Sequence, residues 1–357
     1  MKKKMLYMSH VDWNWIKQRP QFMAEALQEY FDISVVYTYQ NRHRDKLQKR
    51  TDEMLPVHPI YTIPLSSRTT LTRRVDEAFR VWQYGRYVKK YQPDCLYLTY
   101  PTQYPVIPKN FTGKVIYDCM DNHEAMCQKS HKQLMRDYEE KLTSRADYIL
   151  VSAQKLKETL LERYGNALAE KIIIVRNGYN GQILPQEEET VQKQDMFTIS
   201  YIGTIGPWFN FDYLLKSLEE FPNLTYRIIG PADTALPLAD RLVYMGTVEH
   251  HKLHDAIRDV QCLAMPFQLN EIVEAVDPVK LYEYINFNKN ILCVKYKEIE
   301  RFDPFVHFYT DYVSFRDQIQ RMMEDNTLRY SQQDRQIFLS ENNWASRAAQ
   351  ISTVVNK

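Results

Sequence analysis

The stretch Asp-Pro-Val-Lys-Leu-Tyr-Glu-Tyr-Ile-Asn-Phe-Asn-Lys-Asn, residues 277–290, decides the fold prediction. Pro278 suits the first turn of a helix, where its missing N–H has no cost. Lys280 and Glu283 are three residues apart and therefore lie on one face of that helix. The apolar run 291–294 that follows is typical of a buried strand. A helix that faces a ligand and leads into a core strand is expected in an open α/β sheet.

The pair of Lys280 and Glu283 has a chemical interpretation. The N-terminus of a helix has free N–H groups and a partial positive charge, which attract phosphate. Lys280 adds a full charge on the same side, whereas the Glu283 carboxylate accepts hydrogen bonds from ribose or sugar hydroxyls. The pair therefore suits a sugar nucleotide. The alternative is a Lys–Glu pair that only stabilises its own helix.

Length and composition narrow the class of protein. The chain has 357 residues, 44% of them hydrophobic, which is enough for two ordinary domains. A net charge of +1 gives no overall bias toward nucleic acid. The five cysteines form no Cys-X-X-Cys pair, so we expect buried, reduced thiols and a cytoplasmic location. We find no pattern of a signal peptide and no apolar stretch long enough to span a membrane.

Strand and helix patterns alternate along most of the chain, which predicts parallel sheets with helices on both faces. The fold class is therefore α/β, with two doubly wound, Rossmann-like domains. Strands are predicted at 5–9, 33–39, 95–99, 115–118, 148–152, 172–175, 197–202, 226–229, 242–244, 262–265 and 291–294. Helices are predicted at 19–29, 70–91, 132–144, 154–164, 212–219, 249–258, 278–285, 312–323, 328–339 and 344–355.

A polar, acidic segment without periodicity divides the two alternating regions. We assign residues 1–183 to the first domain, 184–196 to a linker, 197–338 to the second domain and 339–357 to a final helix. Ligands of doubly wound sheets bind at the carboxyl ends of the strands. A ligand that faces both domains is therefore expected in a cleft between them.

Several segments of the second domain are expected at the carboxyl ends of its strands, where they would form one nucleotide-binding rim. The glycines after the strand 197–202 would let backbone N–H groups approach a phosphate, unless they only form a tight turn. Trp208 would either stack on a base or sugar or pack against the next helix. Glu249 would either favour a helix dipole or contact the nucleotide. The candidates are Gly203, Thr204, Gly206, Trp208, Gly230, Glu249, Pro266, Val279, Lys280, Tyr282 and Glu283.

The first domain offers candidates for acid–base chemistry. Asp121 follows a predicted strand and is a candidate general base, with Asp118 as its partner or as a helix cap. His10 and Asp12 follow the first strand and are rival candidates. Arg19 begins a helix nearby, where it would guide an anionic acceptor. A turn without catalytic function would give the same pattern.

Two further patterns have weaker interpretations. His250, His251 and His254 are close in sequence, but HExxH and the acidic DxD motif are absent, so we predict no metal. Basic residues gather at 42–50 and 73–90, and aromatic residues interrupt the second run. This composition suits either a membrane surface or a solvated helix face, and we predict no nucleic-acid partner.

Taken in order, several motifs resemble those of the bacterial GT-B glycosyltransferases related to teichuronic-acid biosynthesis enzymes. More distantly, the chain is similar to the glucuronosyltransferase of xanthan assembly. The motifs are Gln18-Arg-Pro20, Tyr117-Asp-Cys-Met-Asp121, Asn177-Gly178, Tyr201-Ile-Gly-Thr-Ile-Gly-Pro-Trp-Phe209, Ile229-Gly-Pro231, Met265-Pro-Phe267, Pro278-Val-Lys-Leu-Tyr-Glu-Tyr284 and Asn343-Trp344.

The resemblance implies a cytoplasmic enzyme that needs no metal or other cofactor and transfers a sugar from a nucleotide sugar, expected to be a UDP-sugar. The second domain would bind the donor. The first domain would bind a glycan or lipid-linked acceptor for the synthesis of a cell-surface polysaccharide, and the final helix would pack on the first domain. Retaining relatives have a second glutamate eight residues before the position of Glu283, where this chain has Ala275, with Glu274 one place away. They also have a basic residue within the segment that corresponds to 203–208, which has none here.

The outcome at the anomeric carbon therefore stays open. So do two other functions, a UDP-sugar epimerase of the same fold and a non-catalytic protein that binds nucleotide sugars.

Overall fold

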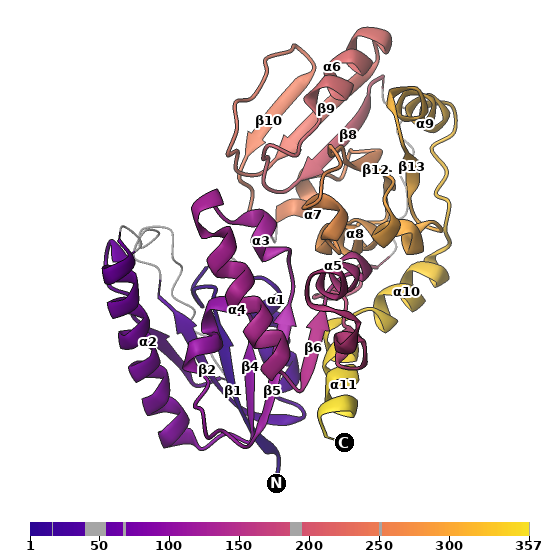
Figure 1. The fold of residues 1–357 in the computed structure, drawn as a ribbon. Coiled ribbons are helices and arrows are strands. Elements are labelled where there is room, and N and C mark those ends of the chain that lie inside the picture. Colours follow the sequence, from indigo (N-terminus) through magenta and orange to yellow (C-terminus); the bar gives the residue numbers. More distant parts are fainter. Residues whose placement is uncertain (16, 40–54, 67–68, 186–194, 250–251, 357) are drawn as a thin grey trace. The chain divides into compact units, whose positions relative to one another are not determined.

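The computed structural model describes residues 1–15, 17–39, 55–66, 69–185, 195–249 and 252–356 (Figure 1). The chain divides into two compact units, Met1–Asn180 with Trp344–Lys357, and Gly181–Asn343. The basic segment 42–50, His250 and His251 lie outside the described residues, as does most of the expected linker. Each unit is described separately below.

A parallel sheet with the strand order β3-β2-β1-β4-β5-β6-β7 forms the centre of the first unit. Its inner strands are nearly continuous apolar runs, as expected when helices cover both faces of a sheet. The strands are β1 (Lys3–Ser9), β2 (Phe31–Thr38), β3 (Val57–Ile60), β4 (Cys95–Leu98), β5 (Lys114–Cys119), β6 (Tyr148–Val151) and β7 (Ile172–Ile174).

The helices of the first unit come from both ends of the chain. They are α1 (Arg19–Leu27), α2 (Thr70–Tyr91), α3 (His123–Met126), α4 (Lys132–Arg145), α5 (Gln154–Tyr164) and α11 (Trp344–Val355). Short 3₁₀ helices cover Pro101–Val106, Lys129–His131 and Asn166–Glu170.

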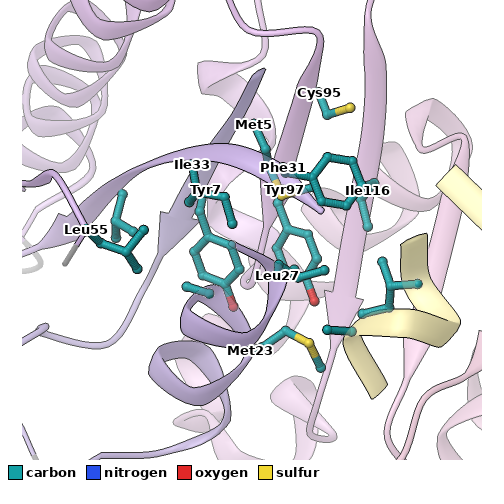
Figure 2. Packing of buried hydrophobic residues seen from close by; sticks show 14 of the residues in the cluster. Met5, Tyr7, Met23, Leu27, Phe31, Ile33, Leu55, Cys95, Tyr97 and Ile116 are labelled. Atoms are coloured by element: carbon teal, nitrogen blue, oxygen red, sulfur yellow. The ribbon is translucent and has the colours of Figure 1, made fainter. Parts of the chain in front are cut away.

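The core of the first unit joins β1, β2, β4, α1 and α11. Figure 2 shows Tyr7 and Tyr97 side by side on neighbouring strands, and their rings stack with centroids 4.4 Å apart. Trp344 of α11 stacks on Phe22 of α1 at 5.4 Å, and Ile351 of the same helix is buried in this core. The structure thus confirms the expectation that the final helix packs on the first domain.

The second unit repeats the architecture with the strand order β10-β9-β8-β11-β12-β13, again parallel. Its strands are β8 (Phe197–Ile202), β9 (Leu224–Ile229), β10 (Leu242–Gly246), β11 (Cys262–Met265), β12 (Asn290–Val294) and β13 (His307–Tyr309). Its helices are α6 (Phe211–Glu220), α7 (Leu253–Ala256), α8 (Val279–Asn286), α9 (Tyr312–Glu324) and α10 (Gln332–Glu341), with 3₁₀ helices at Val273–Ala275 and Lys297–Phe302.

The structure differs from the sequence prediction mainly at the edges of the sheets. The pattern did not predict β3 or β13, which are short edge strands, and Pro59 in β3 is tolerated because an edge strand needs fewer ladder bonds. The predicted helix 249–258 is reduced to α7, whose residues His254 and Asp255 are weak helix formers. α10 begins at Gln332 rather than at residue 328, because the Ser331 side chain caps it by accepting from the Asp334 N–H.

Candidate functional site

Each sheet has one point where its strand order reverses, between β1 and β4 in the first unit and between β8 and β11 in the second. Ligands of doubly wound folds bind outside the carboxyl ends of the strands at such a point. In the first unit, His10 after β1 bonds to Thr99 after β4. In the second, the backbone of 208–210 bonds to that of 266–268. Each unit therefore has one candidate ligand rim where its topology predicts it.

The rim of the second unit is tightest around two glycines and one lysine. A Cβ atom at Gly203, where φ is 147°, would lie 2.0 Å from Cε of Lys280. A Cβ atom at Gly230, where φ is 139°, would lie 2.1 Å from the backbone oxygen of Gly203. Only glycine fits such contacts at positive φ. The structure thus brings together the ends of β8 and β9 and the start of α8, which the sequence analysis grouped.

We expect Gly203→Ala to weaken the binding of UDP at least about tenfold, equal to about 1.4 kcal/mol. The new methyl group must displace the Lys280 side chain or the backbone next to it. Isothermal titration of UDP measures the effect. Gly85→Ala in α2 is the matched control, because a Cβ there meets no atom within 4 Å and should stabilise the helix by about 0.5–1 kcal/mol. Wild-type affinity in Gly203→Ala would contradict the placement of the ligand.

The start of α8 concentrates positive potential beside these glycines. Pro278 is the N-cap and has no side chain that caps the helix, and the Leu281 N–H donates to the Pro278 backbone oxygen at 3.1 Å. The partial positive charge of the helix N-terminus therefore lies beside Lys280. Lys280 is half-buried, and burial lowers the pKa of its ammonium group, while the nearby Glu283 carboxylate opposes that shift. An ammonium group with reduced solvation gains more from an arriving anion than a fully hydrated one.

A buried network fixes the segment before α8. The Asp277 carboxylate accepts a hydrogen bond from Tyr282 Oη at 3.2 Å and forms an ion pair with Arg301. Tyr296 Oη donates to the backbone oxygen of Val276 at 3.1 Å. Tyr282 is fully buried in this network, where its hydroxyl bonds Asp277 and Arg301.

Trp208 is held above the turn that follows β8. Its indole ring covers Gly206, where a Cβ would lie 2.5 Å from the ring. The Tyr201 hydroxyl donates to the backbone oxygen of Thr204 at 2.8 Å within the same turn. The part-exposed indole therefore has a fixed orientation at the rim.

Two other predicted donor contacts have different surroundings from those expected. Pro266 is buried, and its backbone oxygen accepts from Asn210 N–H at 2.8 Å, so it links the two loops of the rim. Glu249 is exposed and forms an ion pair with Lys252 at 3.0 Å. Such an exposed pair contributes little to stability.

The rim of the first unit begins with His10. The Thr99 hydroxyl lies 3.0 Å from the backbone oxygen of Met8 and 2.8 Å from His10 Nδ1, and its one proton serves either acceptor. Burial lowers the pKa of His10 to about 4, so the ring is neutral at physiological pH.

Asp121 lies beyond the end of β5 and keeps partial exposure. Burial raises its pKa to about 6, with the Arg19 charge opposing the shift and Asp118 adding to it. A carboxylate that titrates near neutral pH is suited to general-base catalysis. Asp121 therefore stays the candidate general base of this unit.

His123 and Tyr100 belong to the same rim and were not predicted. The Tyr100 ring stacks on His10 at 4.7 Å and meets His123 edge-on, also at 4.7 Å. Burial lowers the pKa of His123 to about 3, and among the described residues its buried Nε2 has no hydrogen-bond partner. The available signal was their position, since Tyr100 lies two residues after β4 and His123 four residues after β5.

Three candidates of the first unit have structural surroundings that correct the expectations for them. Asp12 is buried, and its side chain accepts from Asn14 N–H at 3.0 Å in a local turn. Arg19 is bound to Asp118 by a buried ion pair with its shortest contact at 2.8 Å, and it also donates to Asn177 at 3.1 Å. Arg19 therefore has no exposed guanidinium for an anionic acceptor, and Asp118 is its partner.

Within the described ranges, no three His, Cys, Asp or Glu residues are grouped closely enough to hold a metal ion. Among those residues, too, no helix is both long and apolar enough to cross a bilayer.

The chain consists of two doubly wound parallel units, each with a rim at its switch point. The C-terminal helix returns to the core of the first unit. These features define the GT-B fold. No family model matches the chain. It is 21% identical over 238 residues to the TuaH protein of Bacillus subtilis (strain 168), whose name describes a teichuronic acid biosynthesis glycosyltransferase. The match covers 61% of this chain, and the chain spans 59% of the length of that relative.

Solved structures extend the likeness in fold to nearly the whole chain. The sucrose-phosphate synthase of Thermosynechococcus elongatus superposes with a TM-score of 0.76 over 99% of this chain and 98% of the other, at 12% identity. Anabaena HepE in complex with UDP and glucose superposes with a TM-score of 0.70 over 99% and 100%, at 13% identity. These matches confirm the predicted fold and the resemblance to GT-B glycosyltransferases.

Proposed function

We propose that the protein is a glycosyltransferase that moves a sugar from a nucleotide sugar, with UDP as the nucleotide, to a hydroxyl group of a glycan or lipid-linked acceptor. The observation that supports this most is the convergence of Lys280, the N-terminus of α8 and the Gly203 backbone. That arrangement suits a diphosphate, and Glu283 one turn further along the helix suits the hydroxyls of a sugar or ribose. The resemblance to TuaH supports a cell-surface polysaccharide, such as a capsule or a teichuronic acid-like polymer, as the product.

We further propose that the reaction needs no metal. Lys280 and the N-terminus of α8 would stabilise the negative charge that develops on the departing diphosphate. In the first unit, Asp121 would accept the proton of the acceptor hydroxyl if the enzyme inverts the anomeric carbon. His10 remains the alternative base, because its ring is neutral at physiological pH. Asp12 is the weakest of the three candidates, since it is buried in its own turn.

Incubation with a panel of nucleotide sugars and acceptors tests the proposal. A glycosyltransferase releases UDP only when it makes a glycosylated product from an acceptor. Conversion of the UDP-sugar without any acceptor would instead identify an epimerase, which the relatives described above support less well. Binding without release of UDP under any condition would identify a non-catalytic nucleotide-sugar protein. A thermal-shift screen identifies the preferred donor first, because a bound ligand raises stability by mass action.

We also propose that the protein works at the cytoplasmic face of the plasma membrane and contacts it through the exposed side of α2. Apolar side chains recur there every three or four residues, with exposed fractions of 72% for Leu71, 51% for Val75 and 56% for Trp82. The acidic residues of this helix are engaged within the unit, Asp76 by Arg80 and Glu77 by Tyr138. The cations of the helix, Arg73, Arg74, Arg86, Lys89 and Lys90, are therefore left to complement an anionic surface.

We expect the protein to float with phosphatidylcholine vesicles that contain phosphatidylglycerol and not with vesicles of phosphatidylcholine alone. Val75→Glu with Trp82→Glu should abolish flotation, because a carboxylate must then be buried in the interface. Val243→Glu, at an exposed position of β10 in the second unit, is the control and should float normally. Flotation that ignores both salt and these substitutions would refute the contact. A shift to a dimer in the wild-type protein alone would assign this face to a second copy instead.

A further inference from the structure

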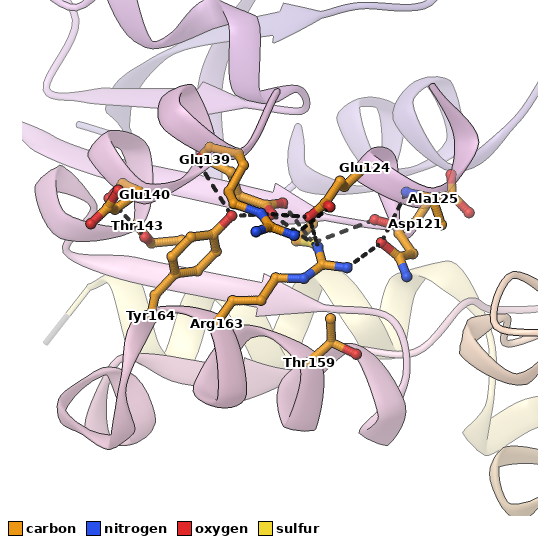
Figure 3. Close-up of polar contacts among 12 residues, drawn as sticks. Asp121, Glu124, Ala125, Glu139, Glu140, Thr143, Thr159, Arg163 and Tyr164 are labelled. Atoms are coloured by element: carbon orange, nitrogen blue, oxygen red, sulfur yellow. Dashed lines mark hydrogen bonds and ion pairs between the residues drawn. The ribbon is translucent and has the colours of Figure 1, made fainter. Parts of the chain in front are cut away.

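A polar network between α3, α4 and α5 lies directly behind the segment that carries Asp121 and His123 (Figure 3). At its centre is Arg163, in the last turn of α5. Its Nη1 lies 3.2 Å from Glu124 Oε2 and 3.6 Å from Glu139 Oε2, and its Nη2 donates to Asn122 Oδ1 at 3.1 Å. One guanidinium group thus bonds the residues on both sides of His123.

The network is anchored deep in the first unit. Glu139 of α4 is buried and accepts hydrogen bonds from the hydroxyls of Tyr117 at 2.8 Å and Tyr164 at 2.9 Å. Burial raises the pKa of Glu139, and the two tyrosine bonds and Arg163 oppose that shift. Because β5, α4 and α5 all contribute to this anchor, Arg163 has little freedom to move.

The segment held by Arg163 is short, and its own bonds link residues within it. α3 is only four residues long, and Asn122 caps it by accepting from Ala125 N–H at 3.3 Å. The His123 N–H donates to the backbone oxygen of Asp121 at 2.9 Å. Any displacement of Asn122 therefore moves both the Asp121 carboxyl and the His123 ring, which contacts Tyr100 and His10.

We propose that Arg163 is a positioning residue, which fixes Asp121 and His123 at the rim of the first unit by bonding Asn122 and Glu124 together. This inference rests on the proposed function only where the test measures enzyme activity. Arg136 provides a control within the network, because it bonds the same Glu124 carboxylate at 2.6 Å but is half exposed and belongs to α4. The charge on Glu124 is thus shared by two arginines, and Arg163 has the additional bond to Asn122.

The test compares Arg163→Met with Arg136→Ala in the full chain. Arg163→Met should lower kcat by about 10- to 100-fold with the KM for the nucleotide sugar unchanged, because small displacements of reacting groups have effects of this size. Arg136→Ala should stay within about twofold of wild type, and Arg163→Lys, which keeps the charge but not the planar fork, should fall between them. Equal losses in both main variants, or none in either, would overturn the proposal.

A second readout is independent of activity. The difference in thermal stability between each background and its Asp121→Asn derivative, followed against pH, reports the pKa of Asp121. Release of the segment in Arg163→Met should return that pKa toward its ordinary value, whereas Arg136→Ala should leave it unchanged. The groups that act on Asp121 from the surrounding elements are Arg19, Asp118, Cys119 and Tyr100, and both variants retain them.

This second readout separates the two proposals. If the wild-type protein transfers no sugar with any donor, the proposed function fails, and the pKa of Asp121 still decides the role of Arg163. If Arg163→Met does not fold, Asn122→Ala tests the same bond with the guanidinium retained. An unchanged pKa of Asp121 in that variant would overturn the positioning role.

Discussion

Replacing Lys280 with methionine is expected to lower kcat/KM for the nucleotide sugar by ~10² to 10³. The substitution keeps the length of a side chain that lies against Gly203 and removes its charge. No basic residue occurs within 203–208 to compensate, so we expect Lys280 to carry most of the phosphate interaction. Steady-state kinetics with the preferred donor measure the loss, and titration of UDP separates ground-state binding from catalysis.

The matched control is Lys216→Met. Lys216 lies in α6 of the same unit, where its ammonium group is 4.0 Å from the centre of the Tyr312 ring. This variant changes the net charge by the same amount and should keep its kcat/KM and UDP affinity. Unchanged UDP affinity in Lys280→Met would remove Lys280 from the phosphate site and would direct attention to the backbone N–H groups of 203–206.

Replacing Asp121 with asparagine is expected to lower kcat by ~10² to 10⁴ and to leave the KM for the donor unchanged. In the wild-type protein, activity should fall as the pH drops below about 6, because the base must be deprotonated. Full turnover in Asp121→Asn, together with a large loss in His10→Ala, would assign the base to His10.

The same substitution has an opposite effect on stability. The folded state raises the pKa of Asp121 from 3.8 to about 6, so the fold favours the protonated carboxyl. The stability that this preference provides is present below pH 3.8 and is lost as the pH rises to about 6. Asp121→Asn avoids that loss and should be more stable than wild type at pH 7, by up to about 3 kcal/mol. The advantage should vanish near pH 3.

Asp118→Asn provides the contrast three residues earlier. It leaves the buried Arg19 without its carboxylate partner and should therefore destabilise the protein by about 3–5 kcal/mol at pH 7. Thermal unfolding of the two variants across the pH range measures both effects. Equal destabilisation by both substitutions would show that Asp121 also has a structural role.

Much of the fold follows from patterns that are local in the sequence. The bounds of α2, α5, α11, β8 and β11 agree with the predicted ranges, because caps, periodicity and buried apolar runs define them within a few residues. The short edge strands could not be found in this way. Each edge strand pairs with only one neighbouring strand, and its sequence shows little alternation between buried and exposed residues.

The candidate site was predictable only in part. Parallel strands place their carboxyl ends on one side, which is why Gly203, Gly230 and Lys280 could be grouped from sequence. Sequence position does not show whether a polar side chain points to the rim or into the unit. Asp12 and Tyr282 follow the same pattern as true rim residues, yet both are buried.

The remaining contacts depend on residues far apart in the sequence. Arg163 reaches Asn122 across a separation of 41 residues, and no periodic pattern predicts such a bond.

The course of the chain has a consequence for its synthesis. The core of the first unit includes Trp344, Ala348, Ile351 and Val355, which follow the whole second unit in the sequence. While the ribosome is still making β8 to α10, the surface of α1 that receives Trp344 lacks its cover. Domains usually fold in order from the N-terminus during synthesis. Here the second unit is one continuous segment and can complete its core first. The first unit, although its synthesis begins earlier, can complete its core only after the second unit has been made.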